Sequence, residues 1–255
     1  MSLRVSRREK QAAYPCGPRG KRARFRRFRI RHPFFTRKLI RIFVKNVKNA
    51  APDAPRPPVY DRLARVYDRA TRPLERLGLA RLRAETLGAL PERGSLLEIG
   101  AGTGANFPFY PRGARVCASE LSGEMLKAAS VKRGGARAEV TLMRCRAEAL
   151  PFADASFDAA CATLVFCSVE SPAGAFAELR RVVRPGGTVA LLEHVRPPDP
   201  LGYLFDALSL VTVPLLEDHF NRHTLEDARR AGLEIVRVRR RLLGVVQTIV
   251  CRVPR

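Results

Sequence analysis

The sequence predicts an α/β fold in which helices cover both faces of a mostly parallel sheet. Three features support this prediction. From residue 95 onward, short apolar segments alternate with segments of helical period, as in strands joined by helical crossovers. A glycine-rich turn follows the first of these strands. Only a short Gly-containing turn separates the last two, which predicts a C-terminal antiparallel hairpin.

The predicted elements follow from composition and period. A helical stretch begins at Val59 and closes near Pro91 and Gly94, and the tetrapeptide VYDR occurs in it twice on one helix face, where it predicts charge pairs. Further helices are predicted at GEMLKAASVKR and SPAGAFAELRRVV. Seven short apolar segments are predicted as strands: 95–100, 114–120, 140–145, 157–165, 188–195, 234–242 and 245–253.

Residues 1–58 differ from the rest of the chain in charge and composition. Residues 1–48 hold seventeen Lys or Arg and one acid, so they carry +16 of the formal net charge of +23. Residues 35–48 place apolar and basic side chains on opposite halves of a helix, which predicts a basic amphipathic helix. The proline-rich segment 51–58 predicts a stiff linker. We therefore expect a basic, partly disordered tail at 1–58 and a separate domain at 59–255.

Three explanations of the tail stay open. Its Arg density suits a nucleic-acid arm. Its separate apolar face suits an anionic membrane surface. Binding to nucleic acid requires only charge and would leave the apolar face unexplained, so the membrane surface is the favoured partner. The third explanation is that translation begins near Val59.

The cysteines and histidines show no metal-binding pattern. Six Cys and four His are present without a CxxC pair or an HExxH pattern, so no metal is expected. Several cysteines lie within apolar segments, which indicates reduced, buried thiols and a cytoplasmic protein that could bind peripherally to a membrane. No apolar stretch of the sequence has the length that a membrane-spanning helix requires.

The turn after the first predicted strand is the strongest candidate site, because open α/β sheets bind ligands there. It holds three glycines, Gly100, Gly102 and Gly104. The spacing also fits a dinucleotide site, with Glu120 at the ribose position. However, Pro108 and Pro111 shorten the following helix, on which a pyrophosphate would depend. Glu98 precedes the turn and would repel a diphosphate, whereas it suits a cationic ligand such as S-adenosylmethionine.

Six segments resemble class I S-adenosylmethionine-dependent methyltransferases, in the branch of the ubiquinone/menaquinone C-methyltransferases. In family order they are YDRLARVYD, LLEIGAGTGANFPFYP, VCASELSGEMLKAA, RAEALPFADASFDAAC, ELRRVVRPGGTVALLEH and NRHTLEDARRAGLE. GTGANFPFYP, LVFCSV and LLEHV are most similar to thiol methyltransferases and their bacterial relatives. The resemblance, which does not cover residues 1–55, implies a Rossmann-like fold with S-adenosylmethionine as cofactor.

The resemblance also implies roles for individual residues. The glycine turn is expected to wrap the methionine part of the cofactor, with Glu98 helping to hold its ammonium group. Glu120 is expected to bind the ribose hydroxyls. The other expected contacts are Leu121 against adenine, Ala147 and Glu148 at the adenine edge, Thr163 beside the methyl group, and Tyr67 closing the site.

The chain departs from the family pattern at two places. Cys145 and Arg146 stand where many relatives have Gly-Asp, so the carboxylate that usually contacts the adenine amino group is missing. Asp218 and His219 stand where thiol-type relatives have Gly-Cys. His219 and His194, which ends the fifth predicted strand, are the candidate bases if the acceptor must lose a proton.

The resulting hypothesis is a methyltransferase that acts on a small apolar or membrane-associated acceptor. Thiols, quinols and lipid amines are the candidate acceptors, and the acceptor is expected beneath the apolar segment 201–216. Two alternatives stay open: an RNA-binding methyltransferase that uses the basic tail, and a cofactor-binding protein without activity.

Overall fold

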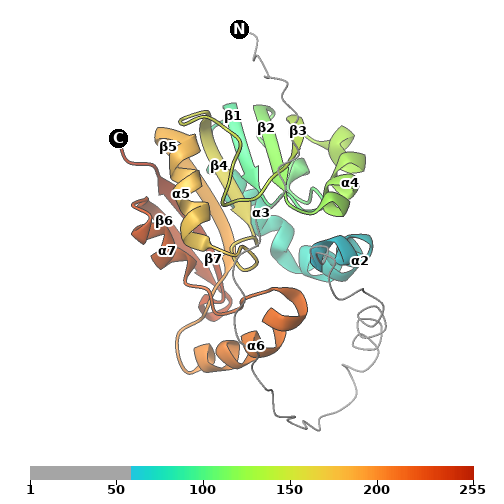
Figure 1. Ribbon diagram of the computed structural model, residues 1–255, viewed down its shortest axis with the longest axis vertical. Helices are drawn as coiled ribbons and strands as arrows, with labels where there is room; N and C mark the ends of the chain where they lie inside the picture. The colour runs from blue at the N-terminus through green and yellow to red at the C-terminus, as the bar shows by residue number, and fades with distance from the viewer. Residues whose placement is uncertain (1–58) are drawn as a thin grey trace, which may run out of the picture. The chain divides into compact units, whose positions relative to one another are not determined.

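One seven-stranded sheet organises the chain, as the sequence predicts (Figure 1). The computed structural model describes residues 59–255, except the side chains at 215 and 216, so the predicted tail and its amphipathic helix lie outside the described residues. The strand order is β3-β2-β1-β4-β5-β7-β6. The strands are β1 Arg93–Ile99, β2 Gly113–Glu120, β3 Glu139–Arg144, β4 Phe157–Thr163, β5 Val183–His194, β6 Glu234–Arg241 and β7 Val246–Arg252.

The directions of the strands confirm a mostly parallel sheet with a C-terminal hairpin. Strands β3, β2, β1, β4 and β5 pair in parallel. Strand β7 pairs antiparallel with both β5 and β6, so it alone runs in the opposite direction. The position of β7 between β5 and β6 gives its apolar side chains two neighbouring strands, and Ile249 and Cys251 are fully buried.

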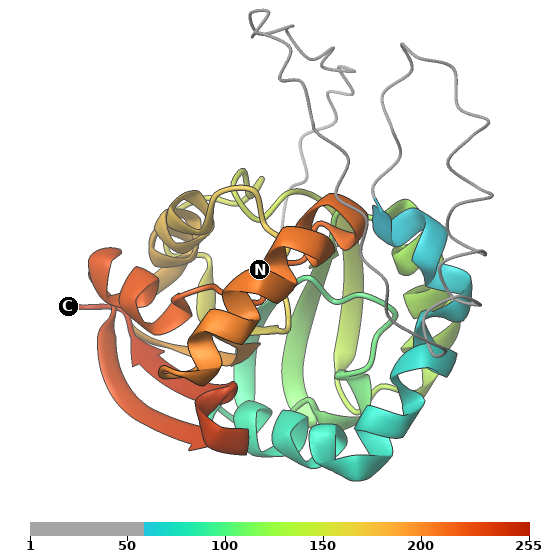
Figure 2. The same cartoon turned by 90° about the horizontal axis from the view of Figure 1, so that it is seen from below.

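Helices cover both faces of the sheet (Figures 1 and 2). Helices α5 Pro172–Val182 and α7 Thr224–Arg230 contribute to one apolar core. Helices α3 Ala80–Leu87 and α4 Gly123–Lys132 contribute to the other. Successive strand side chains point to opposite faces, so Leu97 belongs to the first core and Leu96 to the second.

Two further helices, α2 and α6, lie at the same end of the sheet (Figures 1 and 2). Helix α2, Val59–Leu74, joins α3 through a π-helical segment with a break at Gly78, whose φ is +130°. Helix α6, Leu201–Leu216, follows β5. The Arg196 guanidinium holds it by donating Nε and Nη2 hydrogen bonds of 3.0–3.1 Å to the Asp206 carboxylate.

The connection from β1 to β2 is short. It contains a single 3-10 turn at Phe107–Phe109 and no α-helix, which confirms the effect expected of the two prolines. Within residues 59–255, no helix combines the length and the apolar character needed to cross a membrane.

Phe176 makes a central contribution to the first core. Its fully buried ring stacks on that of Phe166, with 4.2 Å between the ring centroids. We expect Phe176→Ala to lower the free energy of unfolding by about 3–5 kcal/mol, because it leaves a cavity between α5 and the sheet. Val131, on α4, is 86% exposed, and Val131→Ala should change this free energy by less than about 0.5 kcal/mol. Urea denaturation measures both, and equal losses would contradict the assignment of this core.

Candidate functional site

A cavity lies at the carboxyl ends of β1, β2 and β4, the end of the sheet that faces the viewer in Figure 2. It brings together most of the residues that the sequence predicted for cofactor binding. Those that line it are Tyr67, Gly100, Gly102, Glu120, Leu121, Ala147, Glu148 and Thr163. Glu98, Gly104 and the two histidines, His194 and His219, are not among the lining residues.

The turn after β1 requires glycine for two different reasons. All three glycines have positive φ, which other residues rarely adopt. A Cβ atom on Gly100 would lie 2.4 Å from Val165, and one on Gly104 would lie 2.7 Å from the Phe107 ring, so these two allow close packing. A Cβ atom on Gly102 would meet no atom within 4 Å. Gly102 thus leaves open space at the wall of the cavity.

Glu120 ends β2 and is fixed by the backbone. Its Oε2 atom accepts a hydrogen bond from the N–H of Gly102, and its Oε1 atom accepts one from the N–H of Ser122, both at 2.9 Å. Burial raises the pKa of this carboxyl, although the backbone N–H groups oppose that shift. The carboxylate therefore joins the glycine turn to the start of α4, where a ligand with hydroxyl groups could share its oxygens.

Glu98 lies behind the glycine turn. It is fully buried, and its two oxygens accept hydrogen bonds from Asn106 Nδ2 and Tyr110 Oη. Burial raises its pKa to about 7, and the Arg83 guanidinium opposes this rise. Its carboxylate thus anchors the turn from behind, and its expected contact with the cofactor ammonium group stays a prediction.

Arg83 lines the cavity and was missed by the sequence analysis. It is one of many arginines in the N-terminal helical stretch, and no sequence feature distinguishes it from the others as a site residue. The side chain is buried, and Nη1 donates hydrogen bonds to Asn106 Oδ1 at 3.1 Å and Thr163 Oγ1 at 2.6 Å. Its Nε atom donates to the Glu75 carboxylate at 3.0 Å, so the guanidinium that reaches the ends of β1 and β4 is already ion-paired on one side.

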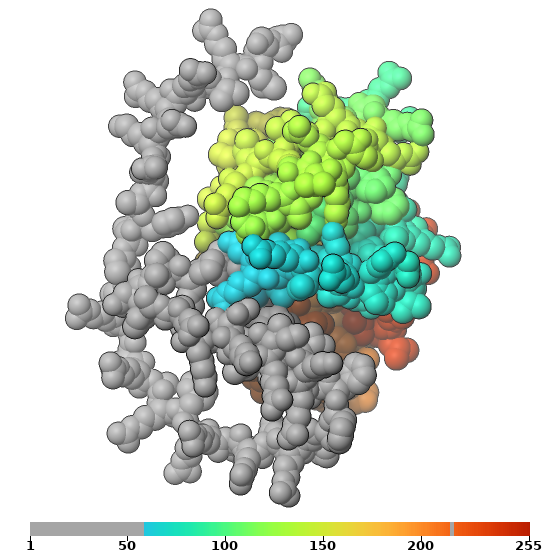
Figure 3. Space-filling view, turned by 90° about the vertical axis from the view of Figure 1, so that its right-hand side faces the viewer, coloured from blue at the N-terminus to red at the C-terminus, as the bar shows by residue number. Residues whose placement is uncertain are grey.

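The repeated VYDR motif has a clearer role than charge pairing. Tyr60 lines the cavity as well as Tyr67, although the sequence analysis singled out Tyr67. Asp61 Oδ1 accepts hydrogen bonds from the Ser122 hydroxyl and from the N–H of Glu124, which holds α2 against the start of α4 (Figure 3). The seven-residue repeat therefore supplies a tyrosine to the cavity in each copy.

The second aspartate of the repeat makes a similar attachment. Asp68 Oδ1 accepts a 2.6 Å hydrogen bond from the Thr103 hydroxyl, next to Gly102, and its Oδ2 atom lies 2.6 Å from Lys132 Nζ. Helix α2, which buries only Ala64, is thus attached mainly by its aspartates.

The loop after β3 forms the side of the cavity where adenine is expected. Glu148 Oε1 accepts hydrogen bonds from the N–H groups of Glu170 and Ser171 at 3.0 and 3.2 Å, which ties this loop to the start of α5. Cys145 and Arg146, which replace the family's Gly-Asp, both line the cavity. Arg146 Nη2 lies 2.6 Å from the Glu170 carboxylate.

The two candidate bases lie close to the ends of β4 and β5. His194 Nε2 is 3.3 Å from Asp218 Oδ1, and the imidazole stacks on Phe220 with 4.5 Å between centroids. The backbone N–H of His219 donates a 2.9 Å hydrogen bond to the Cys167 carbonyl, and burial lowers the pKa of the His219 imidazole. A base role for either histidine stays a prediction.

Comparison with known proteins identifies the domain. The family profile described as "Methyltransferase domain" matches residues 97–191. Human thiol S-methyltransferase TMT1B is 39% identical over 107 residues, which are 41% of this chain and 44% of that protein. The ubiquinone/menaquinone biosynthesis C-methyltransferase UbiE of Syntrophotalea carbinolica is 36% identical over 151 residues, which are 56% of this chain and 63% of that protein. The chain therefore spans less than two thirds of the length of these relatives.

A solved structure has the same fold. The S-adenosylmethionine-dependent methyltransferase TM1293 of Thermotoga maritima, described as a possible histamine N-methyltransferase, superposes with a TM-score of 0.60. The match covers 76% of this chain and 98% of that chain at 22% identity. The chain contains a class I S-adenosylmethionine-dependent methyltransferase domain. The predicted family and the Rossmann-like fold are confirmed.

S-adenosylmethionine is the cofactor of this methyltransferase domain, and the cavity suits it. The open space beside Gly102 can admit a ligand next to the backbone. Glu120 places a carboxylate within the same cavity, next to the glycine turn, where ribose hydroxyls could donate to it. The roles of the individual residues stay predictions.

We expect Glu98→Gln to change how the stability of the methyltransferase domain depends on pH. The pKa of Glu98 rises from 4.5 to about 7 on folding, so the folded state binds more protons between these values. This contribution favours folding below about pH 4.5 and is lost as the pH rises through about 7. The free energy of unfolding of the unaltered protein minus that of Glu98→Gln should therefore decrease by on the order of 3 kcal/mol as the pH rises from 4.5 to about 7.

Urea denaturation of both proteins without cofactor at pH 4.5, 6 and 8 measures this difference. Glu139→Gln changes an exposed carboxyl on β3 and serves as the matched control. A difference between Glu98→Gln and the unaltered protein that stays constant with pH would contradict the buried, shifted carboxyl.

Proposed function

We propose that this chain transfers the methyl group of S-adenosylmethionine to a small apolar thiol. The observation that carries the proposal is the composition of the cavity. Gly102 and Glu120, which suit the cofactor, share it with an aromatic and apolar wall formed by Tyr60, Tyr67 and Val165. A small apolar acceptor would therefore lie next to the cofactor.

For methyl transfer, the protein mainly has to align the acceptor with the cofactor and exclude water. When bound, S-adenosylmethionine supplies a methyl group that its sulfonium already activates. The residues around it hold acceptor and cofactor in line, and such positioning supplies a large part of the rate. Burial raises the pKa of Tyr67 to about 12 and that of Tyr60 above its usual range, so both phenols stay uncharged at neutral pH.

A thiol is the acceptor that this site suits best. Its sulfur is intrinsically more nucleophilic than a hydroxyl oxygen and gives up its proton more readily, so it depends less on a base than a hydroxyl or a carbon acceptor does. This agrees with a cavity in which neither candidate histidine is a lining residue. The relative TMT1B acts on thiols, which supports the same choice. A quinol is the second candidate, supported by UbiE.

The variant Gly102→Asn tests the proposal without disturbing the core. Asn tolerates positive φ, and a Cβ atom at this position meets no protein atom within 4 Å, so the side chain would extend into the cofactor space. We expect the dissociation constant for S-adenosylmethionine to rise at least about tenfold. Gly134→Asn, which also meets no atom within 4 Å, is the matched control at a distant surface turn. Isothermal titration calorimetry gives the affinities.

The same proteins are then tested for release of S-adenosylhomocysteine with alkyl thiols, quinols, lipid amines and RNA. The proposal expects release with thiols in the unaltered protein and in Gly134→Asn, and its loss in Gly102→Asn. Activity with RNA alone would replace the proposal with the nucleic-acid alternative. Binding of the cofactor without release for any acceptor would favour the non-catalytic alternative.

We further propose that the protein meets its acceptor at an anionic membrane surface. Helix α6 supports this because its outer side is apolar. Its exposed large apolar residues are Tyr203, Leu204, Leu208, Leu210 and Val211. Apolar side chains that enter the headgroup region bind a membrane without spanning it.

Replacing two of these residues tests the membrane proposal. For the full chain, we expect the double variant Leu204→Ser, Leu210→Ser to lower recovery with phosphatidylglycerol-containing vesicles at least about threefold, because two exposed leucines no longer enter the lipid. Val131→Ser, on α4, is the control because Val131 is equally apolar and 86% exposed. Sedimentation measures recovery, and equal recovery of both variants would contradict a role for α6.

A further inference from the structure

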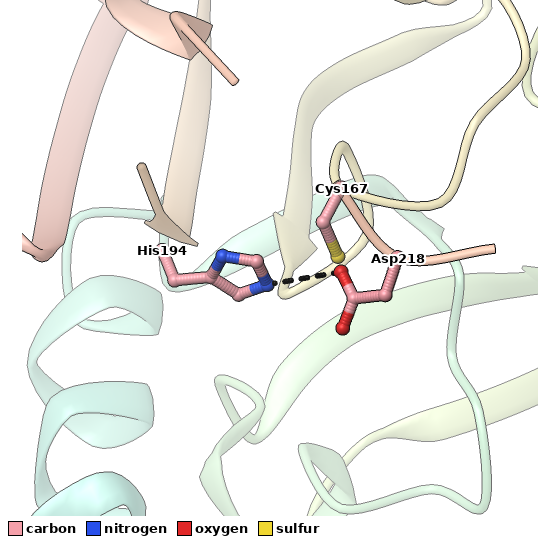
Figure 4. A group of neighbouring side chains, drawn as sticks. All are labelled: Cys167, His194 and Asp218. Atoms are coloured by element: carbon pink, nitrogen blue, oxygen red, sulfur yellow. Dashed lines mark ion pairs between the residues drawn. The ribbon is translucent and has the colours of Figure 1, made fainter. Parts of the chain in front are cut away.

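Three potential metal ligands converge beside the cavity. The thiol of Cys167, the imidazole of His194 and the carboxylate of Asp218 point toward one another (Figure 4). One ligand atom from each lies within 4.8 Å of the other two. They come from the loop after β4, the end of β5 and the segment after α6, so no local sequence spacing marks them.

We propose that Cys167, His194 and Asp218 bind a zinc ion, which holds the thiol acceptor as a thiolate. The proposal rests on the thiol methyltransferase function proposed above. Sulfur, imidazole nitrogen and carboxylate oxygen are the three ligand types that zinc takes in proteins. Catalytic zinc typically has three protein ligands and one position for an exogenous ligand. The proposal thereby departs from the sequence-based expectation of no metal.

The carboxylate of the cluster has an unsatisfied oxygen. Among the residues that the structure describes, Asp218 Oδ1 is buried and accepts no hydrogen bond, and it lies 3.3 Å from His194 Nε2. The Cys167 thiol makes one weak contact, with its sulfur 3.7 Å from the Leu164 carbonyl oxygen. Zinc binds cysteine as the thiolate, so a coordinating Cys167 would lose its proton. Zinc with one thiolate, one carboxylate and one neutral imidazole has no net charge.

Neighbouring contacts hold the three ligands in place. The N–H of His219 donates to the Cys167 carbonyl, and the Thr212 hydroxyl donates a 2.7 Å hydrogen bond to the Asp218 carbonyl. The His194 imidazole stacks on Phe220. The fold therefore brings the three side chains together without an ion.

The cluster adjoins the proposed acceptor cavity. Ser168 and Glu217, the chain neighbours of Cys167 and Asp218, both line the cavity. The cluster is therefore one residue along the chain from the cavity wall at two of its three ligands.

The methyl transfer conserves atoms and charge. On binding zinc, the acceptor thiol releases its proton to solvent. The thiolate sulfur then forms a bond to the methyl carbon as the bond from that carbon to the sulfonium breaks, and the electron pair of the broken bond stays on the cofactor sulfur. The products are a neutral thioether and S-adenosylhomocysteine.

Metal binding is tested on the full chain without an affinity tag. We expect about one zinc ion per chain by elemental analysis after dialysis. With cobalt in place of zinc, we expect a near-ultraviolet charge-transfer band that reports a thiolate ligand. Absence of both signals from the unaltered protein would overturn the proposal without any need for variants.

Variants then assign the ligands. Cys167→Ser and Asp218→Asn should weaken zinc binding at least about 100-fold, because loss of a direct ligand exceeds the usual effect of an outer-sphere change. Cys161→Ser, which replaces a buried thiol on β4 outside the cluster, is the matched control and should bind zinc as the unaltered protein does. Affinity for S-adenosylmethionine verifies that each variant is folded. A folded Cys167→Ser protein that keeps full zinc affinity would disprove the site.

The acceptor role has its own readout. Adding octanethiol to the cobalt-loaded protein should increase the charge-transfer band, whereas a quinol should leave it unchanged. An unchanged band with octanethiol would overturn the acceptor role. Methyl transfer to thiols by a zinc-free protein would refute the role of zinc in holding the acceptor and leave the proposed function intact. Bound zinc without transfer to any thiol would refute the proposed function.

Discussion

The structure depends on the change of direction between β1 and β4. The chain leaves β1 toward β2 and β3 on one side and returns to β4 and β5 on the other. Because these five strands are parallel, their carboxyl ends meet at one edge, and the connections on the two sides diverge there. The cavity occupies this position, and every group proposed for cofactor or acceptor lies in it or beside it.

Buried polar contacts give this crevice a fixed shape. Behind the wall, Asn106 links the Glu98 carboxylate to Arg83, which also bonds to Thr163 at the end of β4. On the outer side, the two aspartates of α2 bond to groups on the glycine turn and at the start of α4. Charge-assisted hydrogen bonds of this kind are short and directional. The cavity is thus formed largely before a ligand enters it.

The two sides of the crevice differ in chemistry. Near β1 and β2, the backbone of the glycine turn and the Glu120 carboxylate present polar groups to the cavity. On the other side, Val165 from the loop after β4 and Tyr60 and Tyr67 from α2 give the wall an aromatic and apolar part, and the thiol, imidazole and carboxylate of Cys167, His194 and Asp218 lie nearby. A polar cofactor and an apolar acceptor would each find a matching side, so the methyl group could pass between them in little water.

The sequence by itself determined the α/β class, the seven strands, the terminal hairpin and the glycine turn, because these follow from local period and from residues such as Gly100 with special backbone needs. Only the tertiary structure placed β7 between β5 and β6. It also turned Arg83 and Tyr60 toward the cavity and brought Cys167 to His194 and Asp218. These outcomes depend on packing between segments far apart in the chain, which a local pattern does not encode.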